Sequence, residues 1–370
     1  MILEPYELRH KIHQNPELSL KEYETTKLLE NNISEISKKY DLDLKIIKPL
    51  ETGLIVEYNG NNLNRDFLLF RADIDALNIK EETNVEFASK NDYMHACGHD
   101  VHTAILYGVL LNVVKNKVKE NIIFLFQPAE ESKGGAERIL KSKVLDRYNI
   151  KSAFALHVTD EYPLGSIATT RGILFASSLE IFIDFEGVSA HLAFPHKSKN
   201  ALNALRTFLD SIDKIPRNPM DPFVIGIGKV MAGNAINILP SHAHLEGSIR
   251  SDNSNKVIEF FQKIEDVLQG IKTITEVNYL LNKGSFYPEV INNGELFDKY
   301  IPKISRKFNF IDCGLKMTAE DFGFISKQYP SLMCWLGTSK GEYYGIHNPK
   351  FLPSDEVIDL GIELFETFMS

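Results

Sequence analysis

The sequence predicts an α/β protein with a substantially parallel, buried sheet, interrupted by a second domain of different texture. Short apolar runs alternate with helix-like segments in the first half of the chain, and this pattern changes after about residue 170. The length of 370 residues exceeds what one hydrophobic core usually organises. We therefore expect two domains.

The first part of the chain predicts a helical layer followed by buried strands. Residues 4–38 have a helical pattern, in which SLKE at residues 19–22 forms a capping box. Beyond residue 52, strands are predicted for GLIVEY, FLLFRAD, NIIFLFQ and SAFALHV, and helices for TAILYGVLLNVVKN and GGAERILKSKVL.

The second part predicts a small sheet covered by two helices. Strands are expected for LEIFIDFEG, FVIGIGKV and HAHLEGSIR, and helices for NALNALRTFLDSI and NKVIEFFQKIEDVLQGI. The first of these helices has one apolar stripe, made of Ala201, Leu205, Phe208, Leu209 and Ile212. The strand SLMCWLG and a final helix then return to the first domain. We expect one domain of residues 1–171 and 283–370, interrupted by a second domain of residues 172–282.

Composition favours a small-molecule substrate over nucleic acid or membrane. The formal net charge is -9, so no strongly basic surface is expected. The N-terminal segment lacks the apolar run of a signal peptide, and no apolar stretch approaches bilayer length. The cysteines Cys97, Cys313 and Cys334 form no disulfide framework. We therefore expect a soluble, cytoplasmic protein in which a cysteine is available as a metal ligand.

A dense group of metal-ligand side chains occurs in MHACGHDVH. It contains His95, Cys97, His99, Asp100 and His102 around a single glycine. A Cys-x-His pair places two donors where a turning backbone directs both at one cation. The alternative is a loop with ordinary histidines, but the density of donors favours a metal.

Adjacent carboxylates follow the predicted strand in FLFQPAEES. Because neighbouring residues rarely serve one role from the same direction, one of Glu130 and Glu131 is expected to bind metal and the other to face the substrate water. A metal lowers the pKa of its water from about 16 to roughly 7, and a nearby carboxylate accepts the proton. The alternative is a solvated helix start, where acids meet the helix dipole favourably.

Two further histidines complete the set of candidate ligands. His157 ends the strand SAFALH, and His347 lies in GIHNPKF. A single histidine beside a strand is more often structural than a ligand. Together, however, five donors suffice for two cations and a bridging water: Cys97, His99, Glu131, His157 and His347.

Several of these motifs carry a resemblance to a known family. RADIDAL, MHACGHDVH, FQPAEE, ALH, SAHLAFPH, TAEDF and GIHNP are similar, in order and interval, to the aminoacylase-like branch of the M20 metallopeptidases and amidohydrolases. The resemblance implies a metal-binding catalytic domain with a mixed, mostly parallel sheet. It also implies a smaller α+β lid domain that interrupts the catalytic domain and forms a homodimer contact.

The resemblance implies roles for individual residues. The five donors named above match the ligands of two divalent metal ions, Glu130 matches the general base, and Asp73 matches an aspartate beside the metals. In the lid, His191, Asn237 and Arg250 match positions that contact substrate, although His191 and Arg250 have structural alternatives. In the peptidase branches the position of Arg71 is usually a ligand histidine and that of Cys97 an aspartate, which favours hydrolysis of acyl amino acids over dipeptides.

The longer similar stretches, such as EYPLGSIAT and DPFVIGIGK, resemble bacterial deacetylases of lysine biosynthesis. These remove acetate from N-acetyl-LL-2,6-diaminopimelate, so an N-acyl amino acid is the expected substrate. A broader aminoacylase or hippurate hydrolase is the alternative, and a non-catalytic metal-binding protein is disfavoured by the intact Glu130. Mixed donors of this kind suit zinc, manganese, cobalt or nickel.

Overall fold

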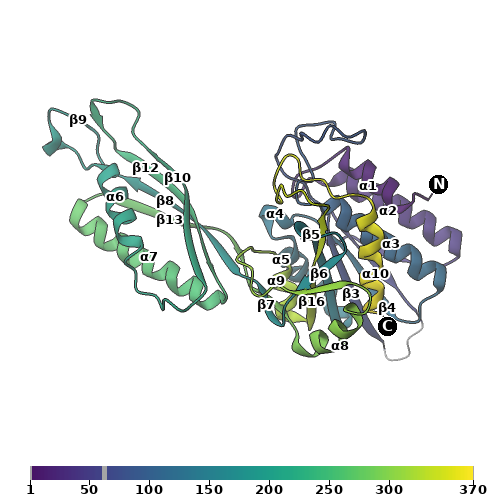
Figure 1. The fold of residues 1–370 in the computed structure, drawn as a ribbon. Helices are drawn as coiled ribbons and strands as arrows, with labels where there is room; N and C mark the ends of the chain where they lie inside the picture. The colour runs from purple at the N-terminus through teal and green to yellow at the C-terminus, as the bar shows by residue number, and fades with distance from the viewer. Residues whose placement is uncertain (1, 61–64, 370) are drawn as a thin grey trace. The chain divides into compact units, whose positions relative to one another are not determined.

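The computed structural model describes residues 2–60 and 65–369, which form two compact units (Figure 1). The first unit comprises Met1–Leu174, Val290–Leu315 and Asp321–Ser370, and the second comprises Phe175–Glu289 and Lys316–Glu320. The sequence placed boundaries after residues 171 and 282. Strand β13 (Asn278–Tyr287) runs through the second of these positions without interruption.

Eight strands form a mixed sheet in the first unit, in the order β1-β2-β4-β3-β5-β16-β6-β15. Their bounds are Lys45–Ile47 (β1), Leu54–Tyr58 (β2), Asp66–Asp73 (β3), Asn121–Gln127 (β4), Asn149–Pro163 (β5), Ser166–Thr169 (β6), Asn309–Asp312 (β15) and Ser331–Ser339 (β16). The neighbours β4, β3, β5 and β16 run parallel, whereas β1 and β2 join antiparallel and β6 pairs antiparallel with β16. The predicted mixed, mostly parallel sheet is confirmed.

Helices cover this sheet and bury its apolar strands. Their bounds are Pro5–His13 (α1), Tyr23–Tyr40 (α2), His99–Asn116 (α3), Glu130–Lys133 (α4), Gly135–Lys141 (α5), Gly294–Ile304 (α8), Phe322–Gln328 (α9) and Glu356–Thr367 (α10), with a 3-10 turn at Val144–Arg147. Helix α3 packs against β3, α1 and α10, which explains why it is apolar on nearly every side. Across the described ranges, no helix is both long and apolar enough to span a bilayer.

The predicted helical layer of residues 4–38 is present as two helices, α1 and α2, separated by an irregular segment that contains Pro16. Proline disfavours helical conformation at the residue before it. The predicted capping box is wrong: the Ser19 hydroxyl donates to Asp75, and the Glu22 carboxylate accepts from the backbone N–H of Ala129.

The second unit contains an antiparallel sheet in the order β10-β12-β8-β13, with helices α6 and α7 packed against it. The bounds of its other elements are Ser177–Glu186 (β8), Phe223–Ala232 (β10), His242–Ser251 (β12), Ala201–Ile212 (α6) and Ser254–Thr275 (α7), with short strands Ala190–His191 (β9) and Ile238–Leu239 (β11) and a 3-10 turn at Pro195–Lys197. The short strands Gly172–Phe175 (β7) and Val290–Asn292 (β14), which pair with each other, belong mainly to the first unit. The predicted stripe of α6 packs in a core separate from that of the first unit, with Leu209 partly buried and its other members fully buried.

Candidate metal centre

Strand β5 and the start of α3 bring three candidate ligands together. Cys97 and His99 flank Gly98, His157 lies on β5, and the three donor side chains are buried. Gly98 has a left-handed φ of 83°, and a Cβ atom there would lie 2.3 Å from Val158 Cγ2. Glycine therefore allows the chain to turn tightly against β5. The Cys97 Sγ to His157 Nε2 distance is 3.3 Å, and donor atoms of all three ligands lie within 4.8 Å of one another.

A second group of donors shares Cys97. It adds Glu131, from the first turn of α4, and His347, from the loop that follows β16. Glu131 Oε1 lies 3.4 Å from His347 Nε2, and the backbone N–H of His347 donates to Ala96 O at 2.8 Å. For metal–ligand bonds of about 2.0–2.3 Å, ligands of one zinc ion lie roughly 3.3–3.8 Å apart. The five predicted ligands thus form two three-donor groups that meet at one sulfur.

Two buried donor atoms at this centre have no hydrogen-bond partner among the described residues. They are His99 Nε2 and Glu131 Oε1, which lie 3.7 Å apart. An unsatisfied buried polar atom costs about 1–3 kcal/mol. A divalent cation bound by both atoms would satisfy them, so the residues present fit a metal.

The electrostatics of the centre also suit a cation. Burial and a neighbouring histidine lower the pKa of His157 well below its usual value, which leaves a neutral ring able to bind metal. Burial and the carboxylate of Glu131 raise the pKa of the Cys97 thiol. Burial alone would lower the pKa of His99, but Asp73 and other carboxylates raise it to about 10. The negative field that retains these protons also attracts a metal, which displaces protons when it binds.

Glu130 is buried next to the predicted ligand Glu131. Its Oε1 atom accepts from the backbone N–H of Asp321 at 3.4 Å, and a carboxylate oxygen lies within 4.8 Å of donor atoms on His99 and Glu131. Ala129, the residue before the pair, has a left-handed φ of 60° that turns the chain sharply at the end of β4. This turn lets two adjacent carboxylates reach the same centre.

Asp75 is a site residue that the sequence reasoning missed. Its carboxylate accepts from the backbone N–H groups of Glu130 and Glu131, each at 3.1 Å, and from the Ser19 hydroxyl at 2.7 Å. It also lies 3.3 Å from His99 Nδ1. The available signal was its place in RADIDAL, where only the first aspartate had been given a role.

A buried charge cluster lies beside the centre and includes Asp73. The Arg71 guanidinium donates to Asp73 at 2.7 Å, Asp321 at 2.8 Å and Gln127 at 2.9 Å, with Arg71 and both aspartate side chains fully buried. The other oxygen of Asp73 lies 2.6 Å from His102 Nδ1. Sequence reasoning missed Asp321, although TAEDF contains it.

The predicted lid residues occupy two places in the second unit. His191, on β9, pairs with β11, and the backbone N–H of Leu192 donates to Asn237 O at 2.9 Å. Arg250 is near the far end of β12, where its Nη1 donates to Met317 O at 2.7 Å. At about 3.4 Å per residue, the ten residues of β12 span roughly 30 Å. His191 and Asn237 are therefore brought together, but Arg250 is not placed with them.

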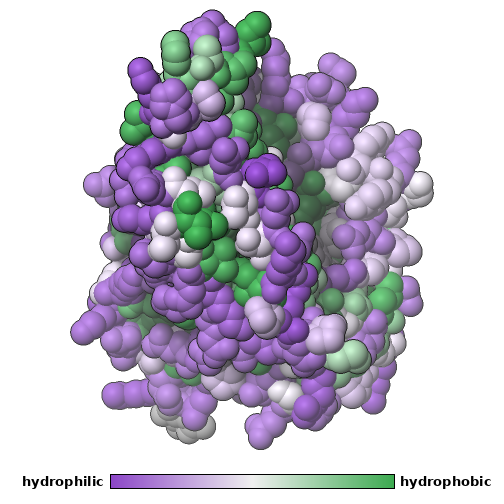
Figure 2. Space-filling model, turned by 90° about the vertical axis from the view of Figure 1, so that its left-hand side faces the viewer, coloured by the Kyte–Doolittle hydropathy of each residue, from purple (hydrophilic) through white to green (hydrophobic). Residues whose placement is uncertain are grey.

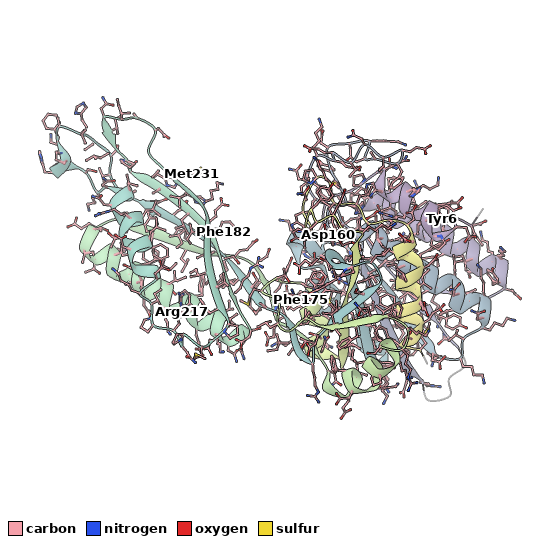
Figure 3. The ribbon with its side chains drawn as sticks, viewed as in Figure 1. Tyr6, Asp160, Phe175, Phe182, Arg217 and Met231 are labelled. Carbon is pink, nitrogen blue, oxygen red and sulfur yellow. The ribbon has the colours of Figure 1, made fainter. Side chains whose placement is uncertain are left out.

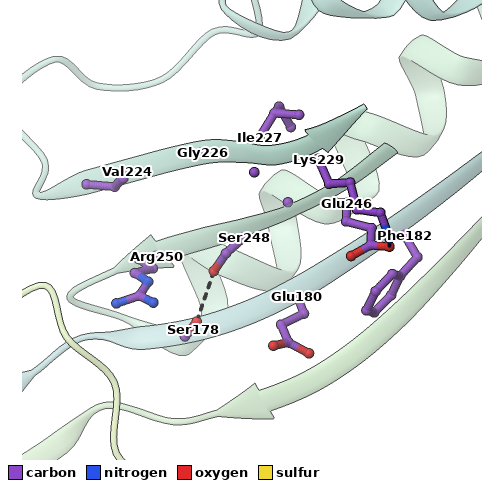
Figure 4. A pocket seen from close by; sticks show the side chains of 12 residues that line it. Ser178, Glu180, Phe182, Val224, Gly226, Ile227, Lys229, Glu246, Ser248 and Arg250 are labelled. Atoms are coloured by element: carbon purple, nitrogen blue, oxygen red, sulfur yellow. Dashed lines mark hydrogen bonds and ion pairs between the residues drawn. The ribbon is translucent and has the colours of Figure 1, made fainter. Parts of the chain in front are cut away.

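Arg250 lines an open pocket of about 590 Å³ on the sheet of the second unit (Figure 4). The hydroxyl oxygens of Ser178 and Ser248 lie 3.2 Å apart in this pocket, near Glu180. The guanidinium thus has polar neighbours on β8 and β12, in addition to the backbone carbonyl that it already binds.

The fold and the donor cluster together are those of a two-unit metal-dependent hydrolase, and comparison with known proteins agrees. The family model described as "Peptidase family M20/M25/M40" matches residues 69–370. The chain belongs to this family, as the motifs predicted.

Proteins that are similar to this chain over nearly its full length have more specific names. The chain is 37% identical over 366 residues to an N-acetyldiaminopimelate deacetylase from Exiguobacterium sibiricum, covering 98% of this chain and 97% of that protein. It is 38% identical to the protein of the same name from Bacillus pumilus, covering 98% and 96%. The crystal structure of Bacillus subtilis YXEP, described as a dinuclear metal-binding peptidase of the M20 family, is similar with a TM-score of 0.80 and 27% identity, covering 99% and 96%.

The Arg71 cluster predicts a large loss of stability when the arginine is replaced. Arg71→Met leaves the buried Asp73 and Asp321 carboxylates without their cation, which costs about 3–5 kcal/mol. Urea unfolding of the metal-free protein measures this cost. Arg171→Met is the matched control, because Arg171 forms an ion pair with Asp298 in which both side chains are 62% exposed. It should change stability by at most about 1 kcal/mol, and an equally small effect of Arg71→Met would contradict the prediction.

Proposed function

We propose that the chain is a metal-dependent amidohydrolase that converts N-acetyl-LL-2,6-diaminopimelate and water to LL-2,6-diaminopimelate and acetate in lysine biosynthesis. The observation that carries the chemistry is the pair of three-donor groups sharing Cys97, with Glu130 beside them. The substrate rests on the relatives named N-acetyldiaminopimelate deacetylase. We place the reaction in the cytoplasm, in keeping with a content of only three cysteines in 370 residues.

We assign the two donor groups to two divalent cations. Cys97, His99 and His157 would hold one, and Cys97, Glu131 and His347 the other. Zinc, cobalt, nickel and manganese all suit this mixture of thiolate, imidazole and carboxylate. Bound there, the cations supply Lewis-acid polarisation of the amide carbonyl and acidify water.

Glu130 performs the proton transfers in this proposal. Its carboxylate accepts a proton from the water whose oxygen bonds to the amide carbon. It returns that proton to the amide nitrogen when the C–N bond breaks, so the amine leaves neutral. Asp73, held by Arg71 and His102, orients the neighbouring imidazoles and itself carries no proton. The backbone N–H of Asp321 keeps the Glu130 carboxylate directed toward the centre.

The test of the function is hydrolysis by purified protein before and after metal removal. Chelation should abolish release of acetate from N-acetyl-LL-2,6-diaminopimelate, and added divalent metal should restore it. The acetyl-diaminopimelate should exceed acetyl-leucine and benzoylglycine in kcat/KM, because a pocket built to pair polar groups penalises a substrate that leaves them unpaired. Full activity without metal would sink the proposal, and a preference for benzoylglycine would select the broader amidohydrolase.

The adjacent glutamates should respond differently to substitution. Glu130→Gln should retain both metals and lower kcat by roughly 10²- to 10⁴-fold with little change in KM, because the lost proton transfers belong to the transition state. Glu131→Ala should lose metal together with activity. Elemental analysis and steady-state kinetics on both variants decide between these roles. Metal loss in Glu130→Gln with retention in Glu131→Ala would reverse the assignment.

We further propose that the second unit acts as a lid and homodimer contact, with His191, Asn237 and Arg250 touching substrate. Because β12 separates Arg250 from the other two within one unit, a dimer allows residues from two subunits to serve one substrate. Exposed apolar side chains beside His191 support this contact: Leu192, Phe194 and Ile238 are about half exposed and Ile236 is 100% exposed. Figure 2 shows small hydrophobic patches on one mostly hydrophilic face of the molecule.

The dimer proposal predicts that Ile236→Asp weakens self-association. An unpaired carboxylate buried in an interface costs at least about 3 kcal/mol, which raises the dimer Kd roughly 100-fold or more. Sedimentation velocity should give twice the mass of one chain for the wild type and a shift toward one chain for the variant. Ile258→Asp is the control, since Ile258 is 47% exposed near the start of α7, which follows the end of β12 that is remote from the β9–β11 pair. A monomeric wild type would exclude the contact.

A further inference from the structure

The loop that carries His347 differs from the segments that carry the other candidate ligands. It follows β16, and the His347 side chain is 49% exposed, whereas that of Glu131 is 9% exposed and that of His99 is fully buried. His347 and Gly345 have left-handed φ values of 64° and 82°. A non-glycine residue in this conformation is strained and persists only where contacts hold it in place. The position of His347 therefore depends on what anchors the loop.

Among the contacts that hold the loop, which include a hydrogen bond from the backbone N–H of Glu82 to Pro349 O at 2.9 Å, two lie at or just before His347. The backbone N–H of His347 donates to Ala96 O at 2.8 Å. The second anchor is Asp160, whose Oδ2 accepts from the backbone N–H of Tyr344 at 2.7 Å and from that of Gly345 at 3.0 Å. Hydrogen bonds to an ionised carboxylate are roughly twice as strong as neutral ones. Asp160 thus accepts hydrogen bonds from two consecutive backbone amides that precede His347.

The location of Asp160 allows it to set the position of His347 relative to the other candidate ligands. It lies on β5, three residues after His157, and only 8% of it is exposed (Figure 3). Strand β5 pairs in parallel with β16, so its backbone is fixed on the side where the loop begins. A cavity of about 300 Å³, lined by Asp160, Tyr344 and Phe351 among others, adjoins the contact. On the side of this cavity the carboxylate holds the loop through hydrogen bonds, while Ile346 packs against the core of the first unit.

We propose that Asp160 is a positioning residue that fixes His347 relative to Glu131 and Cys97, and so maintains one of the two metal sites selectively. The inference rests on the two-metal centre of the proposed function. The group of Cys97, His99 and His157 does not use the loop, so it should bind metal independently of Asp160. Strand β5 therefore carries His157 itself and, through Asp160, also positions the loop that carries His347.

Titration of the metal-free protein with Co²⁺ tests this inference. Isothermal titration calorimetry should show two bound ions in the wild type. Asp160→Ala should keep one site at wild-type affinity and weaken the other roughly tenfold or more, because charge-assisted hydrogen bonds to the loop are lost. Asp160→Asn, which retains one acceptor oxygen, should weaken the same site less. Excess Co²⁺ should restore hydrolysis in both variants.

The control is Glu342→Gln, which makes the same acid-to-amide change on the same loop. The Glu342 carboxylate accepts from the Tyr344 hydroxyl and contacts neither loop amide named above, so both ions should bind as in the wild type. Thermal melting of the metal-free variants monitors the fold. Two sites of wild-type affinity in Asp160→Ala, or equal weakening of both sites, would overturn the proposal. A wild type that binds fewer than two ions would instead refute the two-metal function on which it rests.

Discussion

The positions of several candidate ligands depend on hydrogen bonds to the buried carboxylate of Asp75. Burial alone would raise its pKa, but hydrogen bonds from His99 and Ser19 and from the backbone at Glu131 lower it, so the group is ionised. An ionised carboxylate in a protein interior requires several donors. Those donors come from the segment before α2, the start of α3 and the start of α4. Asp75 therefore fixes the positions of His99, Glu130 and Glu131 together, and none of these segments can shift without leaving its charge unsatisfied.

The charge balance around this contact explains why the centre suits a cation. Arg71 neutralises part of the negative charge, since it pairs with Asp73 and Asp321, and Asp73 lies 3.7 Å from His99 Nε2. Burial would raise the pKa of Asp73, yet His99, Arg71 and other cations hold it well below its usual range. Glu131 instead faces two imidazoles, His99 at 3.7 Å and His347 at 3.4 Å, which lose their protons when they bind a metal. A bound divalent ion would neutralise the negative charge that remains beside Arg71.

Sequence patterns predicted the sheet and the five donors because both are encoded locally. Apolar runs identify buried strands, and the carboxyl ends of parallel strands meet at one edge, so Glu131, which follows β4, and His157, on β5, are expected near that edge. Contacts between distant segments were not predictable in this way. Arg71 and Asp321 are 250 residues apart, and Asp160 meets Tyr344 across 184. The failed capping box at residues 19–22 has the same cause, because tertiary partners took the side chains that a local pattern assigned to a helix terminus.

Arg71 also accounts for the composition of the donor groups. A guanidinium is always protonated and has no acceptor, so it cannot replace the histidine ligand usual at this position in the peptidase branches. Here His99 instead completes a group with Cys97 and His157, and Cys97 serves both groups. Each group therefore keeps three donors despite the arginine. A cysteine donor favours borderline metals such as zinc, cobalt and nickel over magnesium or calcium. The same arginine donates to Asp73 at 2.7 Å, so that carboxylate already has a permanent cation beside it.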